Sequence, residues 1–342
     1  MIAPRKALSD CHTVRAALLR HLGAAESQGI VVRGPVRLGR YSDIYCARLP
    51  GMNTELAVKC LIEPTTGEPD RATAQRQFEA LERVHHAMPA NGHFRVPRPY
   101  LAVPSDGIVV VEWISGRSMT DLFLSTGLTL VEARALMRRA AGWLRCFSDS
   151  GMIAAQPLNV ADKLNALASM ETLLGRSKTA QEAFATLRAY AERAGTLALT
   201  RSWLHGDFKT DNLLIDANHT VGIDLHARHE NAVTHDLAAF LNHWELTLCH
   251  PRAWRWRPWR AELARVFLDT FDPSYLDAKR LPYRWTALHV MLGNWCEFTK
   301  RERRTLQHVY LRMCFRSVVK RMTGQLHVAA HADDQQSTRK TR

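Results

Sequence analysis

Several common functional signatures are missing from this 342-residue sequence. Its seven cysteines include no Cys-x-x-Cys pair, which argues against a zinc ribbon or a redox dithiol. The sequence contains neither GxGxxG nor GxxxxGK followed by Ser or Thr, so it has no Rossmann or Walker nucleotide loop. No apolar run approaches the roughly 18 residues that a membrane-spanning helix requires, and no signal-peptide pattern is present. We therefore expect a cytoplasmic protein with reduced cysteines.

Positive charge is abundant and is concentrated towards the C-terminal end. The formal net charge is +13, and residues 251–342 hold 19 Lys and Arg against 8 Asp and Glu. Such a chain is attracted to polyanions without being specific for any, so we expect no specific nucleic-acid partner. Residues 250–260 interleave Trp254, Trp256 and Trp259 with arginines. This composition suits either a peripheral contact with an anionic membrane or a loop anchored in the core.

The hydrophobic pattern divides the chain into two parts. Strand-like alternation dominates residues 28–114, with one helical pattern at residues 73–88, as in a small antiparallel sheet that carries one helix. Helical patterns dominate the rest, and one short β segment, residues 203–224, interrupts them. The expected organisation is a helical extension at residues 1–27, an N-lobe at 28–114, a C-lobe at 115–324 and a disordered polar tail at 325–342.

The individual elements follow from the same patterns. Strands are predicted at residues 29–38, 43–49, 55–62, 100–103 and 107–114. Helices are predicted at residues 10–22, 73–88, 130–147, 160–174, 178–194, 234–248, 260–271, 283–298 and 303–322.

The strand predicted at residues 55–62 places Lys59 on one of its faces. The opposite face is apolar and carries Leu56, Val58 and Cys60. A cation in this position can bind the α- and β-phosphates of a nucleotide. Half-exposed lysines are also common on strands, so Lys59 alone leaves both interpretations open.

The β segment contains the acidic residues that carry the chemistry. Leu213–Asp216 and Val221–Asp224 flank a four-residue turn and predict a hairpin in which position 216 faces 221 and position 213 faces 224. Asn212 and Asp224 then meet at the open end, and Asp207 lies in the preceding bend. A carboxylate beside a carboxamide oxygen suits Mg²⁺, and a third acid can deprotonate an attacking hydroxyl. Each acid alone would be taken for a turn former, but their joint spacing favours a metal–phosphate site.

Three motifs resemble the signature of the aminoglycoside phosphotransferase and choline kinase group. They are His205-Gly-Asp-Phe-Lys-Thr-Asp-Asn212, Gly222-Ile-Asp224 and His235-Asp-Leu-Ala238. The group consists of small-molecule kinases, so the resemblance implies a bilobal, protein-kinase-like α+β fold with a small antiparallel-sheet N-lobe and a larger helical C-lobe. It also implies that Asp207 is the catalytic base, that Asn212 and Asp224 hold Mg²⁺, and that Asp236 supports the catalytic loop. Lys209 matches protein kinases and could contact the transferring phosphoryl group, or be a solvated loop lysine.

The resemblance extends into the N-lobe through weaker motifs. Leu38–Tyr45 resembles the hairpin that covers the nucleotide, although Gly39 is its only glycine and Ser42 is expected to contribute instead. Glu112–Gly116 resembles the hinge, which implies nucleotide contacts from Glu112 and Ile114.

Ala57-Val-Lys59 resembles the strand that carries the phosphate-binding lysine. Glu79 is the natural candidate for the acidic partner of Lys59. Helical periodicity nevertheless places Gln77 nearer the buried stripe of its helix than Glu79.

The expected function is transfer of the γ-phosphoryl group of ATP, with Mg²⁺, to a hydroxyl of a small molecule. Only eleven residues separate Asp224 from Asp236, too few for the activation segment of a protein kinase, which disfavours protein substrates. The basic C-lobe favours a neutral or anionic acceptor: a sugar, a saccharide or a lipid-linked saccharide. The alternatives are an aminoglycoside or amino-alcohol kinase, and an ATP-binding pseudokinase or binding module.

Overall fold

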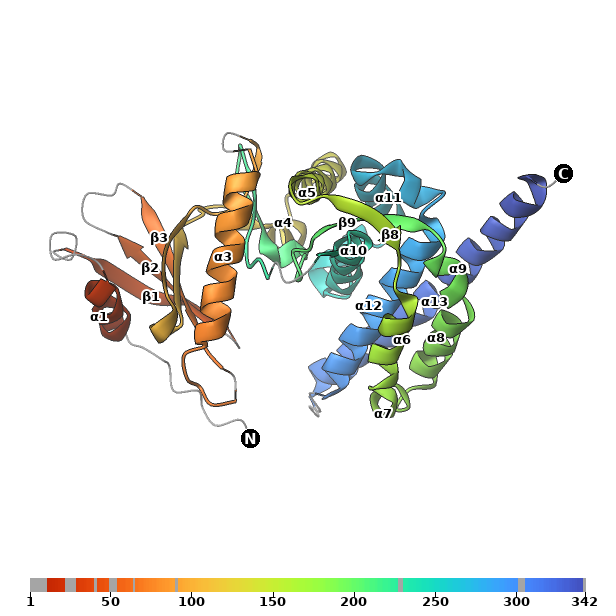
Figure 1. Ribbon diagram of the computed structural model, residues 1–342, viewed down its shortest axis with the longest axis horizontal. Helices are drawn as coiled ribbons and strands as arrows, with labels where there is room; N and C mark the ends of the chain where they lie inside the picture. Colours follow the sequence, from red (N-terminus) through yellow and green to blue (C-terminus); the bar gives the residue numbers. More distant parts are fainter. Residues whose placement is uncertain are drawn as a thin grey trace. The chain divides into compact units, whose positions relative to one another are not determined.

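The computed structural model describes residues 11–21, 29–39, 42–48, 54–63, 65–89, 92–226, 230–300 and 305–340, the side chains of 230 and 333–340 excepted. The chain divides into two compact units, whose elements are labelled in Figure 1. The N-terminal unit comprises Met1–Arg117 and Leu214–Ala227, and the C-terminal unit comprises Ser118–Leu213 and Arg228–Arg342. The first boundary lies close to the expected one. Residues 214–227, which the sequence assigned to the C-lobe, belong instead to the N-terminal unit.

A five-stranded antiparallel sheet forms the base of the N-terminal unit. Its strands, in pairing order, are β1 (Val31–Leu38), β2 (Ser42–Arg48), β3 (Glu55–Leu61), β6 (Ile108–Glu112) and β5 (Pro99–Val103). The apolar patterns of the sequence predicted all five strands to within two residues at each end. The pattern of β3 is clear because Leu56, Val58 and Cys60 on one of its faces are buried.

Two helices pack on this sheet, one on each face of β3 (Figure 1). α1 (Cys11–His21) buries Val14 and Leu18 in the cluster that contains Leu56 and Val58 of β3. α3 (Arg71–Ala87) packs on the other face, where Ala74 joins Leu61 and Val109. Lys59 shares the face of Leu61 because side chains alternate along a strand. The predicted position of Lys59, opposite the apolar face, is confirmed.

The N-terminal unit also contains the hairpin that carries Asp224. A short sheet pairs β4 (Phe94–Arg95), β11 (Thr220–Gly222), β10 (Leu213–Ile215) and β7 (Arg117–Ser118) in that order. The turn is closed by Asp216, whose N–H donates to the oxygen of His219 at 3.1 Å. The Asp216 carboxylate also accepts from the N–H groups of Asn218 and His219, at 2.7 and 2.6 Å.

These contacts correct the predicted register of the hairpin. Position 216 is bonded to position 219 and not to 221, so the turn lies one residue earlier than expected and Thr220 is already part of β11. The reason is the aspartate side chain, which binds backbone N–H groups two and three residues ahead and fixes the turn at its own position.

The C-terminal unit is mainly helical, as expected. Its helices are α4 (Met119–Leu124), α5 (Leu130–Ser150), α6 (Val160–Ala168), α7 (Glu171–Leu174), α8 (Lys178–Ala189), α9 (Ala191–Gly195), α10 (Thr234–Thr247), α11 (Arg260–Phe271), α12 (Arg280–Lys300) and α13 (Leu306–Lys340). Two long predicted helices are each divided, into α6 with α7 and α8 with α9. Within the described ranges, no helix combines the length and the apolar character needed to cross a membrane.

A three-stranded antiparallel sheet in this unit corrects the expectation of a single β segment. Its pairing order is β12 (Glu230–Ala232), β9 (Ala198–Trp203) and β8 (Ile153–Pro157). Four of the five residues of β8 are exposed. An edge strand of this kind has no apolar alternation, which is the signal that sequence analysis uses.

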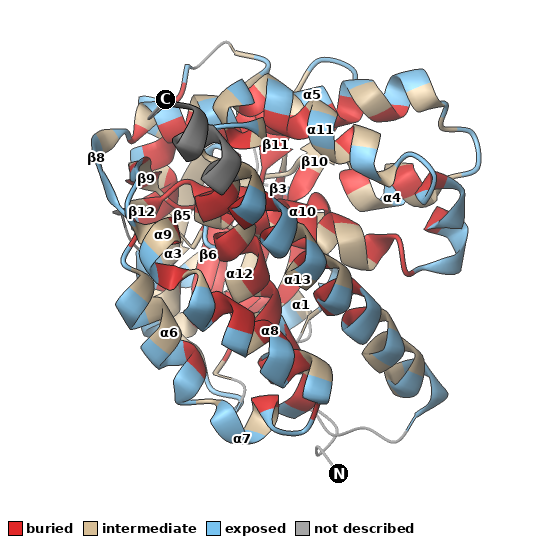
Figure 2. Ribbon diagram, turned by 90° about the vertical axis from the view of Figure 1, so that its right-hand side faces the viewer, coloured by how far each residue is buried: buried red, intermediate tan, exposed pale blue. Residues whose placement is uncertain are grey.

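The core of the C-terminal unit contains a continuous stack of aromatic rings. Trp143 of α5 stacks on Phe208 with ring centres 5.4 Å apart, and Phe208 stacks on Phe240 of α10 at 5.1 Å. Phe240 in turn stacks on Phe267 of α11 at 4.5 Å. Figure 2 shows buried residues concentrated along α10 and α12. Phe208 lies directly after Asp207, so the stack ties the predicted catalytic loop to the core.

Helix α13 corrects the expectation of a disordered tail from residue 325. The helix continues through Lys340, and Leu326, Ala329 and Ala330 are buried. These residues are three and four positions apart, the spacing of one helix face. A guanidinium N–H of Arg193 in α9 also donates to the oxygen of Ala330 at 2.7 Å. Alanines contribute little hydrophobic signal, so the polar composition concealed this face.

Candidate active site

A buried aspartate in α10 holds the loop that contains Asp207. The two carboxylate oxygens of Asp236 accept from the N–H groups of His205 and Gly206, at 2.7 and 3.3 Å. Gly206 has a φ of +82°, a conformation that glycine adopts without strain. Burial raises the pKa of Asp236 to about 7, against the effect of the two hydrogen bonds. Asp236 therefore fixes the bend from the following helix, as the resemblance implies.

The side chains of three predicted site residues meet at this bend. Lys209 Nζ donates to Asp207 Oδ2 at 2.5 Å, and Asn212 Nδ2 donates to the same oxygen at 3.0 Å. Asn212 also donates to the backbone oxygen of Asp207 at 2.9 Å. The short 3₁₀ helix Thr210–Asn212 turns the chain back and makes these contacts possible. Asp207 remains 41% exposed and Asn212 is buried. The Asp207 carboxylate is therefore held by protein donors and is still accessible to solvent.

Sequence analysis missed a second polar group beside this loop. Asp211 Oδ2 lies 3.4 Å from His243 Nε2. The hydroxyl of Thr210 lies 2.8 Å from His243 Nδ1 and 2.6 Å from the hydroxyl of Thr120. The hydrogen bond with His243 holds the pKa of Asp211 well below its usual range. A signal was available, because His243 is seven residues after Asp236 and so lies on the same face of α10.

The site residues of the N-terminal unit form a separate group around Lys59. Lys59 Nζ donates to Asp224 Oδ1 at 2.7 Å and to Gln77 Oε1 of α3 at 3.0 Å. Lys59 is only 15% exposed and Asp224 is 31% exposed. Asp224 has a φ of +60°, in the left-handed region that few residues other than glycine adopt. A predicted phosphate-binding cation and a predicted metal ligand are thus in direct contact.

The expected role of Glu79 is wrong. Its side chain is exposed and accepts from Gln75 of the same helix at 2.6 Å. Residues 77 and 79 are two positions apart and therefore project from nearly opposite sides of α3. Gln77 takes the place facing Lys59, and the carboxylate partner comes from Asp224.

The two residues predicted to bind Mg²⁺ lie in different units. Asn212 belongs to the C-terminal unit and Asp224 to the N-terminal unit, and their convergence on one ion stays a prediction. The two donor groups, a carboxamide oxygen and a carboxylate, are the hard oxygen ligands that Mg²⁺ prefers.

The predicted nucleotide-covering loop is described at its two ends. The N–H of Gly39 donates to the oxygen of Ser42 at 2.8 Å. A Cβ atom at position 39 would lie 2.8 Å from that same oxygen, so this turn requires glycine. Residues 40 and 41 lie outside the described residues. Contacts of Gly39 and Ser42 with a nucleotide stay predictions.

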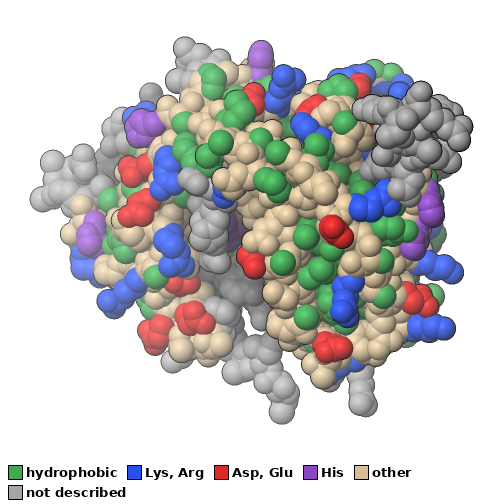
Figure 3. Space-filling view, turned by 45° about the vertical axis from the view of Figure 1, so that its right-hand side comes forward, with side chains coloured by type: hydrophobic (Ala, Val, Ile, Leu, Met, Phe, Trp, Pro, Cys, Tyr) green, Lys and Arg blue, Asp and Glu red, His purple; other side chains and the backbone are tan. Residues whose placement is uncertain are grey.

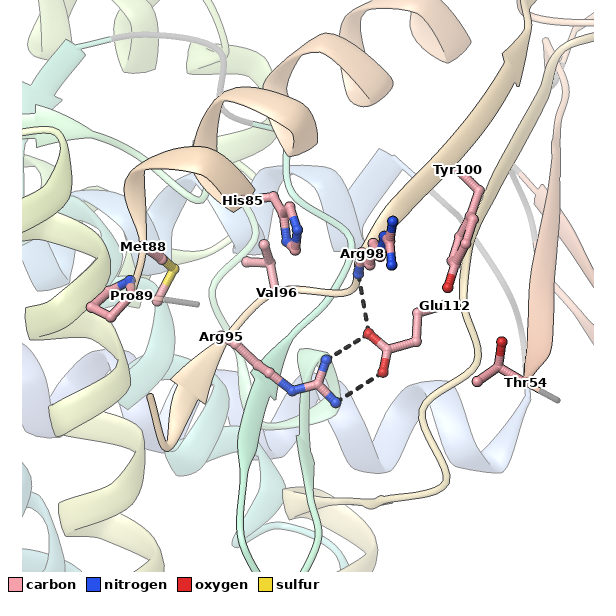
Figure 4. A pocket seen from close by; sticks show the side chains of 9 residues that line it. All are labelled: Thr54, His85, Met88, Pro89, Arg95, Val96, Arg98, Tyr100 and Glu112. Atoms are coloured by element: carbon pink, nitrogen blue, oxygen red, sulfur yellow. Dashed lines mark hydrogen bonds and ion pairs between the residues drawn. The ribbon is translucent and has the colours of Figure 1, made fainter. Parts of the chain in front are cut away.

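At the predicted hinge, the Glu112 side chain is committed to two arginines. Both oxygens pair with the Arg95 guanidinium, at 2.5 and 3.0 Å, and one also accepts from the N–H of Arg98 at 3.2 Å (Figure 4). Ile114 is half-buried. Nucleotide contacts by the backbone at Glu112 and Ile114 stay predictions.

The Trp/Arg stretch serves mainly to anchor its own loop. Trp256 is 4% exposed, and its ring N–H donates to a backbone oxygen of α4 at 2.9 Å. Arg255 stacks on Trp256 and Arg257 on Trp254, at 4.5 and 4.8 Å. Trp254 and Trp259 are 48% and 41% exposed. The sequence left membrane contact and core anchoring open for this stretch. Trp256 is anchored in the core, and a membrane contact by Trp254 and Trp259 stays a prediction.

On the face drawn in Figure 3, the Lys and Arg side chains of the described residues are scattered among acidic and apolar ones.

Known proteins resemble this chain in sequence and in fold. The model of the phosphotransferase enzyme family, APH, matches residues 62–278. The fold is similar to an ethanolamine kinase from Plasmodium vivax (9% identity, TM-score 0.58, covering 90% of this chain and 86% of that one). It is also similar to the ADP-bound aminoglycoside phosphotransferase APH(2'')-Ib (13%, 0.55, 92% and 98%). A third similar structure is a glucosamine kinase in complex with glucosamine, ADP and inorganic phosphate (17%, 0.51, 89% and 81%).

At these identities the structural likeness shows the fold alone. The expected α+β, protein-kinase-like architecture is confirmed. No curated protein sequence matches the chain.

Proposed function

The chain belongs to the phosphotransferase enzyme family, and from that premise we propose that it transfers the γ-phosphoryl group of ATP to a hydroxyl of a neutral or anionic small molecule. Transfer of a phosphoryl group to a hydroxyl of a small molecule is the activity of the family. One observation supports the detailed assignment above all. An accessible carboxylate, Asp207, is held by Lys209 and Asn212 in a bend that Asp236 braces.

Asp207 is the residue that accepts the hydroxyl proton. Its Oδ2 is fixed by two donors, which keeps the carboxylate in one orientation. A positioned base of this kind contributes roughly 10²- to 10⁴-fold to the rate. Lys209, in contact with the base, is also placed to neutralise charge on the transferring phosphoryl group.

Lys59, Asn212 and Asp224 position the phosphates. Asn212 donates its amide N–H to Asp207, which makes its Oδ1 the atom suited to a metal. Together with the Asp224 carboxylate it provides hard oxygen donors for Mg²⁺, which when bound neutralises phosphate charge. The contact between Lys59 and Asp224 keeps the lysine beside the second Mg²⁺ ligand. Positioning of the phosphates and neutralisation of their charge then supply most of the rate acceleration.

The charge of the C-terminal unit supports a neutral or anionic acceptor. An acceptor that carries ammonium groups needs carboxylates that are not already paired. Several carboxylates of this unit are engaged: Asp211 with His243, Glu245 with Arg321, and Glu262 with Arg134. A sugar, a saccharide or a lipid-linked saccharide meets this condition better than a polyamine.

An amino-alcohol or aminoglycoside kinase is the second candidate. The similar structures include an ethanolamine kinase and an aminoglycoside phosphotransferase. A screen of ADP release over neutral sugars, saccharide phosphates, lipid-linked saccharides, amino alcohols and aminoglycosides separates the candidates, with Asp207→Asn as the blank. We expect turnover with a neutral or anionic acceptor. Turnover restricted to amines, or kanamycin resistance on expression, would contradict that acceptor class. ATP binding without turnover on any acceptor would instead identify a pseudokinase.

A further inference from the structure

A pocket of about 250 Å³ lies in the N-terminal unit, where the end of α3 meets β5 and the end of β6 (Figure 4). Its volume is below the roughly 300 Å³ at which pockets for drug-sized ligands begin, so it suits a small ligand. One wall is apolar and consists of Met88, Pro89 and Val96. The polar lining comes from Thr54, His85, Arg95, Arg98, Tyr100 and Glu112.

The polar lining carries a surplus of positive charge. Arg95 and Glu112 neutralise each other through their two-pronged ion pair. Arg98 lies over the ring of Tyr100 at 5.2 Å. Among the residues described, no carboxylate lies within ion-pair distance of the Arg98 guanidinium. Within the described part of the chain, the Arg98 guanidinium is therefore the lining cation that no carboxylate neutralises.

The pKa of His85 reflects this surplus of positive charge. Burial lowers its pKa, and the charges of His86, Arg98 and Arg95 lower it further, against the opposing effect of Glu112. The neighbouring His86, Arg98 and Arg95 thus disfavour a positive charge on the His85 ring, whereas Glu112 favours it. An anion in the pocket would relieve this repulsion and favour protonation of the ring.

We propose that this pocket binds a phosphate-type anion, either inorganic phosphate or the phosphate group of a small phosphorylated molecule. Its donors come from different segments: the hydroxyls of Thr54 and Tyr100, the guanidinium of Arg98 and the ring of His85. Figure 4 shows these side chains arranged around the Arg95–Glu112 pair. A tetrahedral oxyanion offers acceptor oxygens in several directions and matches such a set, whereas a carboxylate offers them in one plane.

The Glu112 side chain, which lines the pocket, is separated from Lys59 by the sheet. Glu112 is paired directly with Leu56 across the strands, and Lys59 is paired with Val109. Directly opposed residues of antiparallel strands share a face, and positions 56 and 59 of β3 lie on opposite faces. The Glu112 side chain is therefore on the side of the sheet opposite to Lys59. The proposal does not depend on the proposed function.

Calorimetric titration of the full-length protein with inorganic phosphate, at constant ionic strength in chloride, tests the proposal. We expect saturable binding that Arg98→Gln weakens by about tenfold or more, the effect of one charge-assisted hydrogen bond. The matched control is Arg76→Gln, an exposed arginine of α3 that donates to Thr73 of its own helix. Equal affinity in Arg98→Gln would overturn the site.

Two further arms identify the ligand class. If glycerol 3-phosphate binds more tightly than inorganic phosphate, the ligand is a small phosphorylated molecule. If inorganic phosphate binds more tightly, the ligand is free phosphate. Acetate that binds as tightly as either would overturn the phosphate class. In NMR spectra, with the signal assigned through His85→Gln, bound phosphate should raise the pKa of the His85 ring. A pKa that does not move in the saturated protein would contradict binding at this pocket.

Discussion

The two groups of site residues are held in place by different kinds of interaction. In the N-terminal unit, Lys59 and Asp224 are positioned by their own ion pair and by Gln77, and both are partly exposed. In the C-terminal unit, Asp207 is positioned by a buried scaffold: Asp236 binds the backbone before it, and Phe208 after it stacks in the core. Substitutions that change charge should therefore affect the first group locally. Substitutions that change packing should affect the second group through the stability of the whole C-terminal unit.

Replacing Phe208 by alanine should have the largest effect on stability. The side chain is fully buried between Trp143 and Phe240, and losing such a ring lowers the free energy of unfolding by about 3–5 kcal/mol. Turnover should fall as well, since Asp207 precedes this anchor. Urea unfolding and ADP release measure the two effects. Trp259→Ala, at an exposed ring, is the control and should change stability little; equal losses in both variants would refute the scaffold.

Replacing Lys59 by methionine should have the next largest effect, on catalysis and not on stability. The pair with Asp224 is partly exposed, so its loss should change the free energy of unfolding by about 1 kcal/mol or less. The KM for ATP should rise about tenfold or more, because a charge-assisted contact with phosphate is lost. Steady-state kinetics with varied ATP test this. Glu79→Gln should behave like the unaltered protein, and a comparable rise in its KM would restore Glu79 as the partner.

A further expected effect is a pH dependence of stability that arises from Asp236. Its folded-state pKa, about 7, lies above its ordinary value, so its favourable contribution to stability is full below about pH 4 and declines as pH rises to about 7. The stability advantage of the unaltered protein over Asp236→Asn should therefore shrink across that range. Urea unfolding at several pH values measures it. An advantage that grows with pH would mean that the carboxylate is charged throughout.

The N-terminal sheet was the part of the fold most predictable from the sequence. Strand β3 buries Leu56, Val58 and Cys60 on one face, so alternation showed both its position and the direction of Lys59. The weaker predictions depended on contacts that no local pattern records. Asp216 fixed the hairpin turn through its side chain, and β8 is an exposed edge strand without alternation.

The candidate site was predictable where several residues form one motif. Asp207, Lys209 and Asn212 lie within six residues of sequence, and the structure brings their side chains together. Partners from distant segments were harder to find. Asp224 is the partner of Lys59 from 165 positions away, and His243 reaches Asp211 from the far end of α10. Helical periodicity already favoured Gln77 over Glu79, so that correction was available from the sequence itself.

The central claim is that Asp207 is the base of a phosphoryl transfer to a small-molecule hydroxyl. The most direct measurement compares Asp207→Asn with the unaltered protein in ADP release, with the acceptor that the screen identifies, and in ATP binding by calorimetry. The account predicts that the variant binds ATP with unchanged affinity while kcat falls by about 10³-fold, within the usual range for a positioned base. An unchanged kcat would contradict it.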